Sequence, residues 1–244
     1  MRYLKLIVAY DGTNYNGFQR QKNGVGVQQV LEQALSELCG EKILLKAAGR
    51  TDAGVHALGQ VISFATEATI PAENISRAIR YLLPGDIVVC KGEEVTKDFH
   101  ARYSAKEKTY KYKIIRTPIV DPCLRNYSWE IKEELDLPAM EKATKYLVGT
   151  HDFSAFRNTG SEMTTPVRTI KEAKWKKQGK EYTFTITGNS FLYRMVRNLV
   201  GCLVKVGKGK ITPEQFQKIL AGKDRKAVGM AAPAQGLYLV KVTY

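Results

Sequence analysis

Four side chains that can do chemistry stand within seven residues of one another: Arg50, Thr51, Asp52 and His56. They lie in residues 47–60, where three glycines recur at intervals of five. Glycines let a backbone turn sharply and approach another molecule closely. The segment is therefore predicted to be a loop, and loops on a rigid scaffold are where catalytic groups concentrate. An Asp beside Gly also commonly caps its own backbone, so on pattern alone a structural Asp52 stays open.

A carboxylate that acts as nucleophile or base must be ionised and yet poorly solvated, and a nearby guanidinium reconciles these demands by stabilising the charged form. Arg50 is a near neighbour of Asp52 in sequence. Arg194 and Arg197 are three residues apart on a predicted helix, both on the side away from its apolar stripe. They equally fit a solvated helix face, and spacing does not choose between them.

Aromatic and basic residues elsewhere could hold a nucleic acid. Tyr110 alternates with lysines in a predicted strand, where it is either a core aromatic or a ring that stacks on a base. Arg20 follows an aromatic in Phe-Gln-Arg-Gln, and His100 and Arg102 follow one in Phe-His-Ala-Arg. An aromatic beside a cation suits base stacking and phosphate contact. Leu237 reads simply as the start of a strand.

These residues need elements to position them. The first half reads as strand, helix, strand, strand, helix, strand, with the helix over residues 27–38 ended by Gly40. The order β-α-β-β-α-β is that of a ferredoxin-like unit. The expected elements are strands at residues 3–10, 43–45, 61–65 and 87–90, and helices at 27–38 and 75–82.

The second half repeats this order with additions. The expected strands are 109–115, 127–131, 168–175, 182–187 and 237–242, and the expected helices are 140–147, 192–203 and one capped by Thr212. We therefore expect an α+β protein of two ferredoxin-like halves, residues 1–104 and 105–244. Their strands would form a mixed, largely antiparallel sheet with helices packed on one face.

The composition indicates a polyanionic partner. The 244 residues carry 38 Lys and Arg against 24 Asp and Glu, a formal net charge of +14. Such an excess favours nucleic acid, because each neutralised phosphate releases counterions. No apolar run approaches the length of a membrane span, so no membrane association is expected. Four scattered cysteines indicate a reduced, cytoplasmic protein, and three histidines without ligand spacing predict no metal site.

Residues 49–57 read G-R-T-D-A-G-V-H-A and resemble the signature of the tRNA pseudouridine synthase A family. The resemblance extends over essentially the whole chain. It implies a homodimeric isomerase that needs no cofactor and converts uridine to pseudouridine in the tRNA anticodon stem-loop, at tRNA positions 38–40. It makes Asp52 the catalytic carboxylate. Whether Asp52 attacks as a nucleophile or removes a sugar proton stays open.

The same resemblance assigns further roles. Met-Val-Arg-Asn-Leu-Val-Gly matches the family motif whose arginine pairs with the aspartate, which selects Arg197. Tyr110 matches a tyrosine that stacks on the flipped base, and Leu237 an apolar residue of the base pocket. The substrate-binding residues expected by the same comparison are Arg50, Arg20, His100 and Arg102.

Three other functional classes fit the sequence less well. A non-catalytic RNA-binding protein would fit the charge and the element order but leaves the Arg-Thr-Asp triplet unexplained. A zinc deaminase requires His-x-Glu and Pro-Cys-x-x-Cys, and neither occurs. A glycosidase-type hydrolase requires a second carboxylate, and none lies inside the motif.

Overall fold

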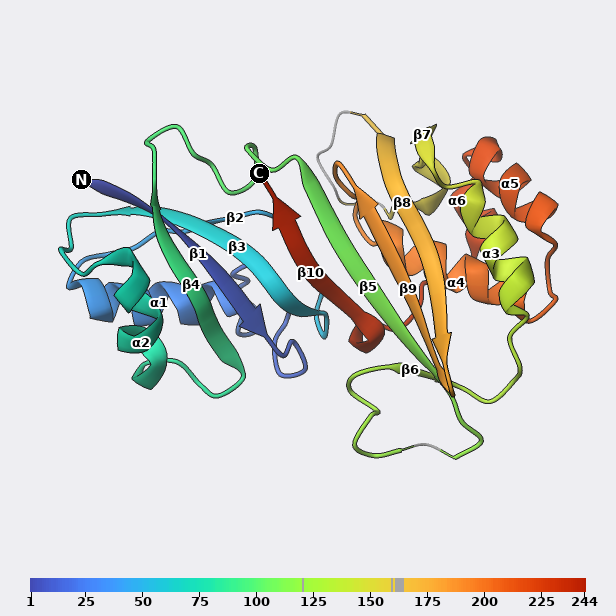
Figure 1. Ribbon diagram of the computed structural model, residues 1–244, viewed down its shortest axis with the longest axis horizontal. Coiled ribbons are helices and arrows are strands. Elements are labelled where there is room, and N and C mark those ends of the chain that lie inside the picture. Colours follow the sequence, from blue (N-terminus) through green and yellow to red (C-terminus); the bar gives the residue numbers. More distant parts are fainter. Residues whose placement is uncertain (120, 159, 161–164) are drawn as a thin grey trace. The chain divides into compact units, whose positions relative to one another are not determined.

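The computed structural model describes residues 1–119, 121–158, 160 and 165–244 (Figure 1). The chain forms two compact units. Unit 1 comprises residues 1–106 and 238–244, and unit 2 comprises residues 107–237. The expected junction at 104/105 lies two residues before this first crossing, and the last strand groups with unit 1 although it follows unit 2 in sequence. That residues 1–104 and 105–244 are separate domains stays a prediction.

Unit 1 has the predicted β-α-β-β-α-β order. Its strands run in the spatial order β4-β1-β3, all antiparallel, with β2 antiparallel to β3 and β10 parallel to it. Figure 1 shows α1 behind β1 and β4. The elements are β1 (Arg2–Tyr10), α1 (Val27–Cys39), β2 (Lys46–Ala47), β3 (His56–Thr66), α2 (Ile75–Ala78), β4 (Ile87–Val95) and β10 (Leu237–Thr243).

The apolar periodicity explains these elements. Alternate residues of β1 are buried, and the buried positions of α1 recur at helical spacing. Gly40 ends α1 in the left-handed conformation, with φ 68°. The predicted strand at 43–45 is wrong. Its backbone N–H groups at Ile43 and Leu45 donate to the Ser36 hydroxyl and the Glu32 carboxylate of α1, so they are not available to a neighbouring strand.

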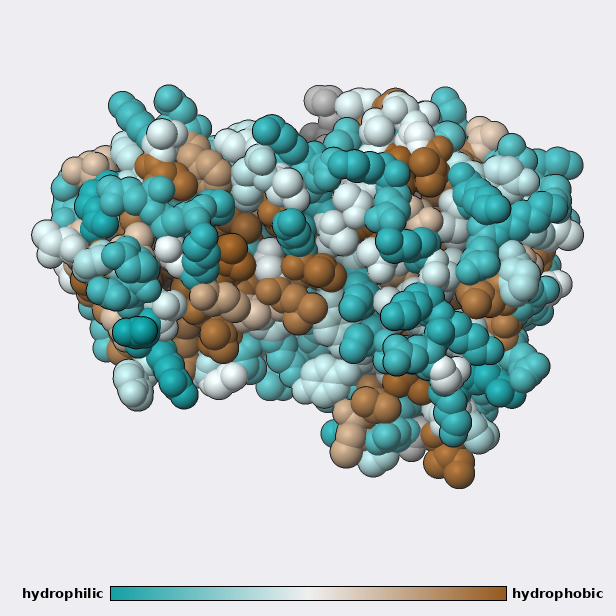
Figure 2. All heavy atoms as spheres, in the orientation of Figure 1, coloured by the Kyte–Doolittle hydropathy of each residue, from teal (hydrophilic) through white to brown (hydrophobic). Residues whose placement is uncertain are grey.

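Unit 2 is built on the antiparallel strand order β5-β9-β8-β7, with the short β6 parallel to β5. Alternate residues in the middle of β5 and along β9 are buried, whereas all four lysines of β8 are exposed. Figure 2 shows hydrophilic side chains gathered over β8 and β9. The elements are β5 (Glu107–Arg116), β6 (Trp129–Ile131), α3 (Leu137–Lys145), β7 (Gly149–Asp152), β8 (Val167–Gln178), β9 (Glu181–Gly188), α4 (Met195–Gly207), α5 (Pro213–Gly222) and α6 (Arg225–Val228).

The first residues of α5 and α4 differ in how well the sequence predicts them. The capping box of α5 is confirmed, since Thr212 and Gln215 bond each other's backbone N–H groups. Helix α4 begins at Met195, three residues later than predicted, because Arg194 adopts φ 58°. A left-handed Arg cannot continue a right-handed helix, so the residues before it lie outside α4.

The α+β prediction, mixed and largely antiparallel, is confirmed. Over the described ranges, no helix combines the length and apolar character needed to cross a bilayer.

Candidate active site

The Arg-Thr-Asp loop connects β2 to β3 and is anchored at its centre by Thr51. The Thr51 side chain is buried, and its hydroxyl lies 2.7 Å from the Tyr10 hydroxyl. Burial raises the pKa of Tyr10 to about 12, so this phenol stays protonated at neutral pH. The Thr51 carbonyl accepts the Phe18 N–H at 3.1 Å. Asp52, half-buried, is therefore attached directly to a fixed residue.

A second set of bonds fixes the ends of the loop. The Val55 N–H donates to the Asp52 carbonyl at 3.1 Å and closes a turn in which Gly54 has φ 76°. The Gln60 amide donates to the Gly49 carbonyl at 2.9 Å. On the loop side, both bonds use backbone carbonyl groups, those of Asp52 and Gly49. Arg50 is exposed.

The loop also rests against residues 11–17, and two glycines make that approach possible. A Cβ at Gly12 would stand 2.1 Å from the Val55 carbonyl oxygen. A Cβ at Gly17, which has φ 86°, would stand 2.6 Å from the Thr51 carbonyl oxygen. Two polar, glycine-containing segments separated by over thirty residues of sequence thus form one close-packed surface in unit 1.

His56 is a buried residue of unit 1 that contacts both Tyr238 and the backbone of Gly12. It is 2% exposed, and its ring stacks on that of Tyr238 with centroids 4.8 Å apart. The Gly12 N–H donates to His56 Nδ1 at 3.1 Å. Asp11 Oδ1 also lies 3.1 Å from Nδ1. Asp11 Oδ1 also accepts hydrogen bonds from the N–H and the hydroxyl of Thr13.

Unit 2 carries three of the predicted site residues, Tyr110, Arg197 and Leu237. Tyr110 lies on β5 with 8% of its surface exposed, and its ring meets the Phe191 ring edge to face with centroids 5.1 Å apart. This burial fits both the core role and the wall of an apolar pocket. Phe191 was not foreseen, because nothing in the sequence links residues 110 and 191.

Arg197 is held by the segment that follows α6. Its Nε donates to the Ala232 carbonyl at 2.8 Å, and the Ala232 N–H donates to the Arg197 carbonyl at 3.0 Å. A Cβ at Gly201 would stand 2.4 Å from the Met230 carbonyl oxygen, so only glycine lets this segment lie so close to α4. The Arg194 guanidinium instead lies 5.2 Å from the centre of the Tyr193 ring.

The same segment is attached to β5. The Tyr112 hydroxyl donates to the Pro233 carbonyl at 2.8 Å, and a Cβ at Gly236 would stand 2.6 Å from Tyr112 Cζ. Burial raises the pKa of Tyr112, against an opposing effect of the Arg197 charge, so the phenol remains a donor. The segment then makes one 3-10 turn and leads into Leu237, which is buried.

A buried polar network that sequence reasoning missed supports α4. The Asn198 amide is fully buried and donates to the Phe156 carbonyl at 2.8 Å. Arg225 on α6 donates to Asn198 Oδ1 at 3.0 Å and to the Gly229 carbonyl at 2.7 Å. The available signal was an asparagine inside the most apolar helix of the chain, since a buried amide must be bonded.

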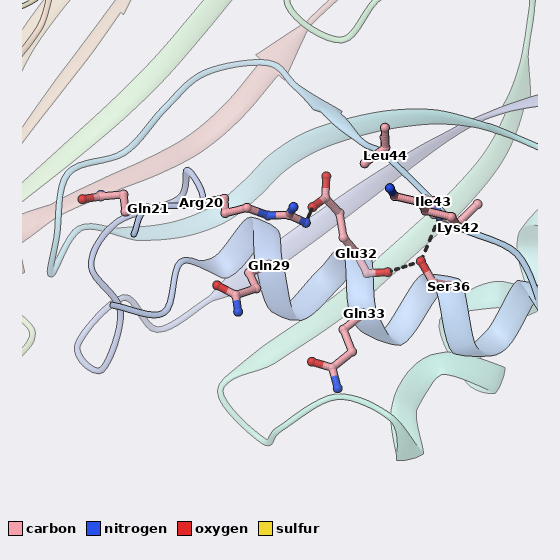
Figure 3. A pocket seen from close by; sticks show the side chains of 9 residues that line it. All are labelled: Arg20, Gln21, Gln29, Glu32, Gln33, Ser36, Lys42, Ile43 and Leu44. Atoms are coloured by element: carbon pink, nitrogen blue, oxygen red, sulfur yellow. Dashed lines mark hydrogen bonds and ion pairs between the residues drawn. The ribbon is translucent and has the colours of Figure 1, made fainter. Parts of the chain in front are cut away.

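Arg20 lies at the edge of a hollow on unit 1 (Figure 3). The hollow has a volume of about 440 Å³ and is lined by α1 and by residues around position 43. The Arg20 guanidinium pairs with the Glu32 carboxylate, whose other oxygen accepts the Leu45 N–H at 3.1 Å. Glu32 is buried and Arg20 is 54% exposed, so Arg20 neutralises a buried charge while remaining accessible.

His100 and Arg102 share one turn. The Arg102 N–H donates to His100 Nδ1 at 3.1 Å. Burial lowers the pKa of His100, and the charge of Lys46 adds to the effect. His100 is thus a neutral acceptor that shapes the turn, whereas the Arg102 side chain is exposed.

A family model described as tRNA pseudouridine synthase matches residues 6–104 and 143–244. The chain belongs to this family. It is an isomerase that converts uridine to pseudouridine, the reaction that defines pseudouridine synthases.

Curated relatives agree over the full length. The chain is 48% identical over 244 residues to "tRNA pseudouridine synthase A" of Acetivibrio thermocellus and 46% identical over 245 residues to that of Ruminiclostridium cellulolyticum, covering 100% of every chain compared. A solved H/ACA RNP bound to a substrate RNA containing 2'-deoxyuridine matches with TM-score 0.39 and 11% identity. That match covers 82% of this chain and 43% of the other.

The two kinds of match cover the site residues unequally. Asp52, Arg197 and Leu237 lie within the residues matched by the synthase family model, whereas Tyr110 falls in its gap between residues 104 and 143. The full-length synthase relatives span Tyr110 as well. The catalytic and substrate-binding roles of all these residues remain predictions.

Gly201→Ala is expected to destabilise this synthase by about 1–3 kcal/mol and to lower its turnover. The new methyl would overlap the Met230 carbonyl and push the Ala232 acceptor away from Arg197. Urea unfolding and a pseudouridine assay measure the two effects. Gly222→Ala at the end of α5 is the control, because a Cβ there meets nothing within 4 Å. Equal behaviour of the two variants would contradict the close approach at Gly201.

Proposed function

We propose that this synthase isomerises uridines in the anticodon stem-loop of tRNA, with Asp52 as the catalytic carboxylate. The relatives' names supply the RNA class, and the anchored loop is the observation that carries the residue assignment. Thr51 is fixed through both its hydroxyl and its carbonyl, so its neighbour Asp52 has little freedom to move. A fixed carboxylate is what attack at one atom of a bound nucleotide requires.

By the same family resemblance, Arg197 is the proposed partner of the catalytic carboxylate. Its Nε is engaged by Ala232, which orients the rest of the guanidinium. Tyr110 stacks on the extruded uracil, and Leu237 lines the space around it.

The chemistry follows from these groups. The uridine leaves its stack, which costs a few kcal/mol that contacts to the flipped base offset. Asp52 then attacks the nucleoside or removes a sugar proton, and the glycosidic N–C bond breaks. The uracil turns within the enclosed pocket and its C5 bonds to C1′, as the Asp52–sugar bond breaks or as the sugar regains the proton it lost. The C5 proton is then lost, and N1 takes up a proton. Enclosure matters because a detached base must not escape.

The net charge of +14 favours binding of the RNA backbone. Arg50, Arg20, His100 and Arg102 are the proposed contacts outside the base pocket. A cytoplasmic homodimer, as the family resemblance implies, is part of the same proposal.

An unmodified tRNA transcript tests this function. After incubation with the enzyme, carbodiimide labelling and reverse transcription should reveal new stops at anticodon-arm uridines. A transcript with cytidines at those positions is the matched control and should show none. Stops elsewhere in the transcript would contradict the anticodon assignment, and the absence of any stop would contradict tRNA as the substrate.

A further inference from the structure

Tyr103 is an aromatic ring displayed to solvent on a turn of unit 1. It is 76% exposed and lies in the turn formed by residues 99–104, which we call the Tyr103 turn. Single exposed aromatics are common and need no explanation by themselves. This one differs because its backbone is rigidly held and a guanidinium accompanies it.

The Tyr103 turn is closed by reciprocal hydrogen bonds. The Ser104 N–H donates to the His100 carbonyl at 2.9 Å, and the His100 N–H donates to the Ser104 hydroxyl oxygen at 3.0 Å. Ala101 follows His100 in the turn and is buried. Its N–H donates to the Ser63 hydroxyl on β3, and its carbonyl accepts from the Tyr244 hydroxyl at 2.7 Å. The turn is therefore fastened to the strands of unit 1 from both sides.

The ring itself is also restrained. His100 Nδ1 accepts the N–H groups of Arg102 and Tyr103, at 3.1 and 3.4 Å. The His100 and Tyr103 ring centroids are 4.4 Å apart, and the Arg102 guanidinium carbon lies 5.6 Å from the centre of the Tyr103 ring. A preorganised ring loses little conformational entropy when a partner covers it.

The charges around the Tyr103 turn favour an anionic partner. Residues 97–106 contain Lys97, Arg102 and Lys106 against a single acid, Asp98. Lys46 on β2 is close enough for its charge to help lower the pKa of His100. An exposed aromatic face beside cations is the arrangement that binds unpaired nucleotides, since each base offers a π-face next to a phosphate.

We propose that Tyr103 stacks on an unpaired base of the RNA substrate while Arg102 contacts the adjacent phosphate. This rests on the proposed function for the identity of the substrate. The stacked base is not the uridine that is isomerised, because that base must be enclosed and Tyr103 is open to solvent. Stacking does not read base identity, so the turn positions the RNA without selecting a sequence.

The first test compares Tyr103→Ala with Tyr103→Phe in binding to an unmodified tRNA transcript. Loss of one stacked base predicts an affinity about 5- to 150-fold weaker for Tyr103→Ala and little change for Tyr103→Phe. Tyr81→Ala is the matched control, because Tyr81 is 90% exposed, lies in the same unit and also follows an arginine. Unchanged binding by Tyr103→Ala, or equal loss in Tyr81→Ala, would overturn the proposal.

A second test identifies the base. Transcripts with one abasic nucleotide each are bound to the wild-type protein and to Tyr103→Ala. Stacking predicts one position at which the two proteins bind equally, and an unchanged difference at every position would overturn it. Pseudouridine formation by the wild type is assayed separately. A protein that shows the Tyr103 effect but forms no pseudouridine would refute the proposed function and leave the stacking intact.

Discussion

Asp52→Asn is expected to abolish pseudouridine formation, with turnover lower by about 10⁴-fold or more, the upper end of what one positioned catalytic group contributes. Asparagine has the same shape but neither ionises nor attacks as a carboxylate does. The Val55 N–H donates to the backbone carbonyl at position 52, a bond that asparagine keeps, and urea unfolding checks that the variant folds. Single-turnover assays on a tRNA transcript measure the loss, and affinity for the transcript should stay within about threefold of wild type.

The control for this experiment is Glu37→Gln, which neutralises an exposed carboxylate of the same unit outside the loop. It should turn over at the wild-type rate. Retained turnover in Asp52→Asn would show that the carboxylate is structural, the alternative that the sequence pattern left open.

Arg197→Lys is expected to lower turnover by about 10²- to 10³-fold, comparable to the loss of one preorganised charged donor. Lysine keeps the charge but has a single nitrogen. In Arg197, Nε donates to the Ala232 carbonyl, and the rigid fork of a guanidinium can bond a second partner through its terminal nitrogens at the same time. Lysine cannot serve both directions in the same geometry. Stability should fall by only about 1 kcal/mol, the value of one hydrogen bond, as measured by urea unfolding.

Arg194→Lys is the matched comparison, three residues earlier in the chain. Arg194 lies beside the Tyr193 ring before α4 begins, so its replacement should reduce turnover only a few-fold. If Arg194→Lys were the more damaging substitution, the assignment of the catalytic arginine would be reversed.

Strong local signals predicted most of the fold. The helix ended by Gly40 and the capping box at Thr212 depend on contacts within a few residues, and both are present. The strand expected at 43–45 failed because side chains of α1 take its backbone donors, which is a tertiary effect. The short elements β7 and α6 were missed because four residues carry too little periodicity to register.

The candidate site was predictable only where several chemical groups crowd one loop. Asp52 was predicted in this way, and its catalytic role stays a prediction. Helical spacing places Arg194 and Arg197 on similar faces of a helix but does not show which residues pack against those faces. The bond from Arg197 to Ala232 could therefore not be predicted from the sequence. Phe191 and the Asn198–Arg225 network were missed for the same reason, since their partners are distant in sequence.

Unit 1 is assembled from two pieces of chain, with all of unit 2 inserted before its final strand. Strand β10 brings Tyr238 onto His56 and Tyr244 onto the Tyr103 turn. During synthesis, residues 1–106 emerge first but lack these contacts until the last strand arrives. The earliest part of the nascent polypeptide must therefore wait, with the His56–Ala57 end of β3 unpaired with β10, for the most recently made residues to complete it.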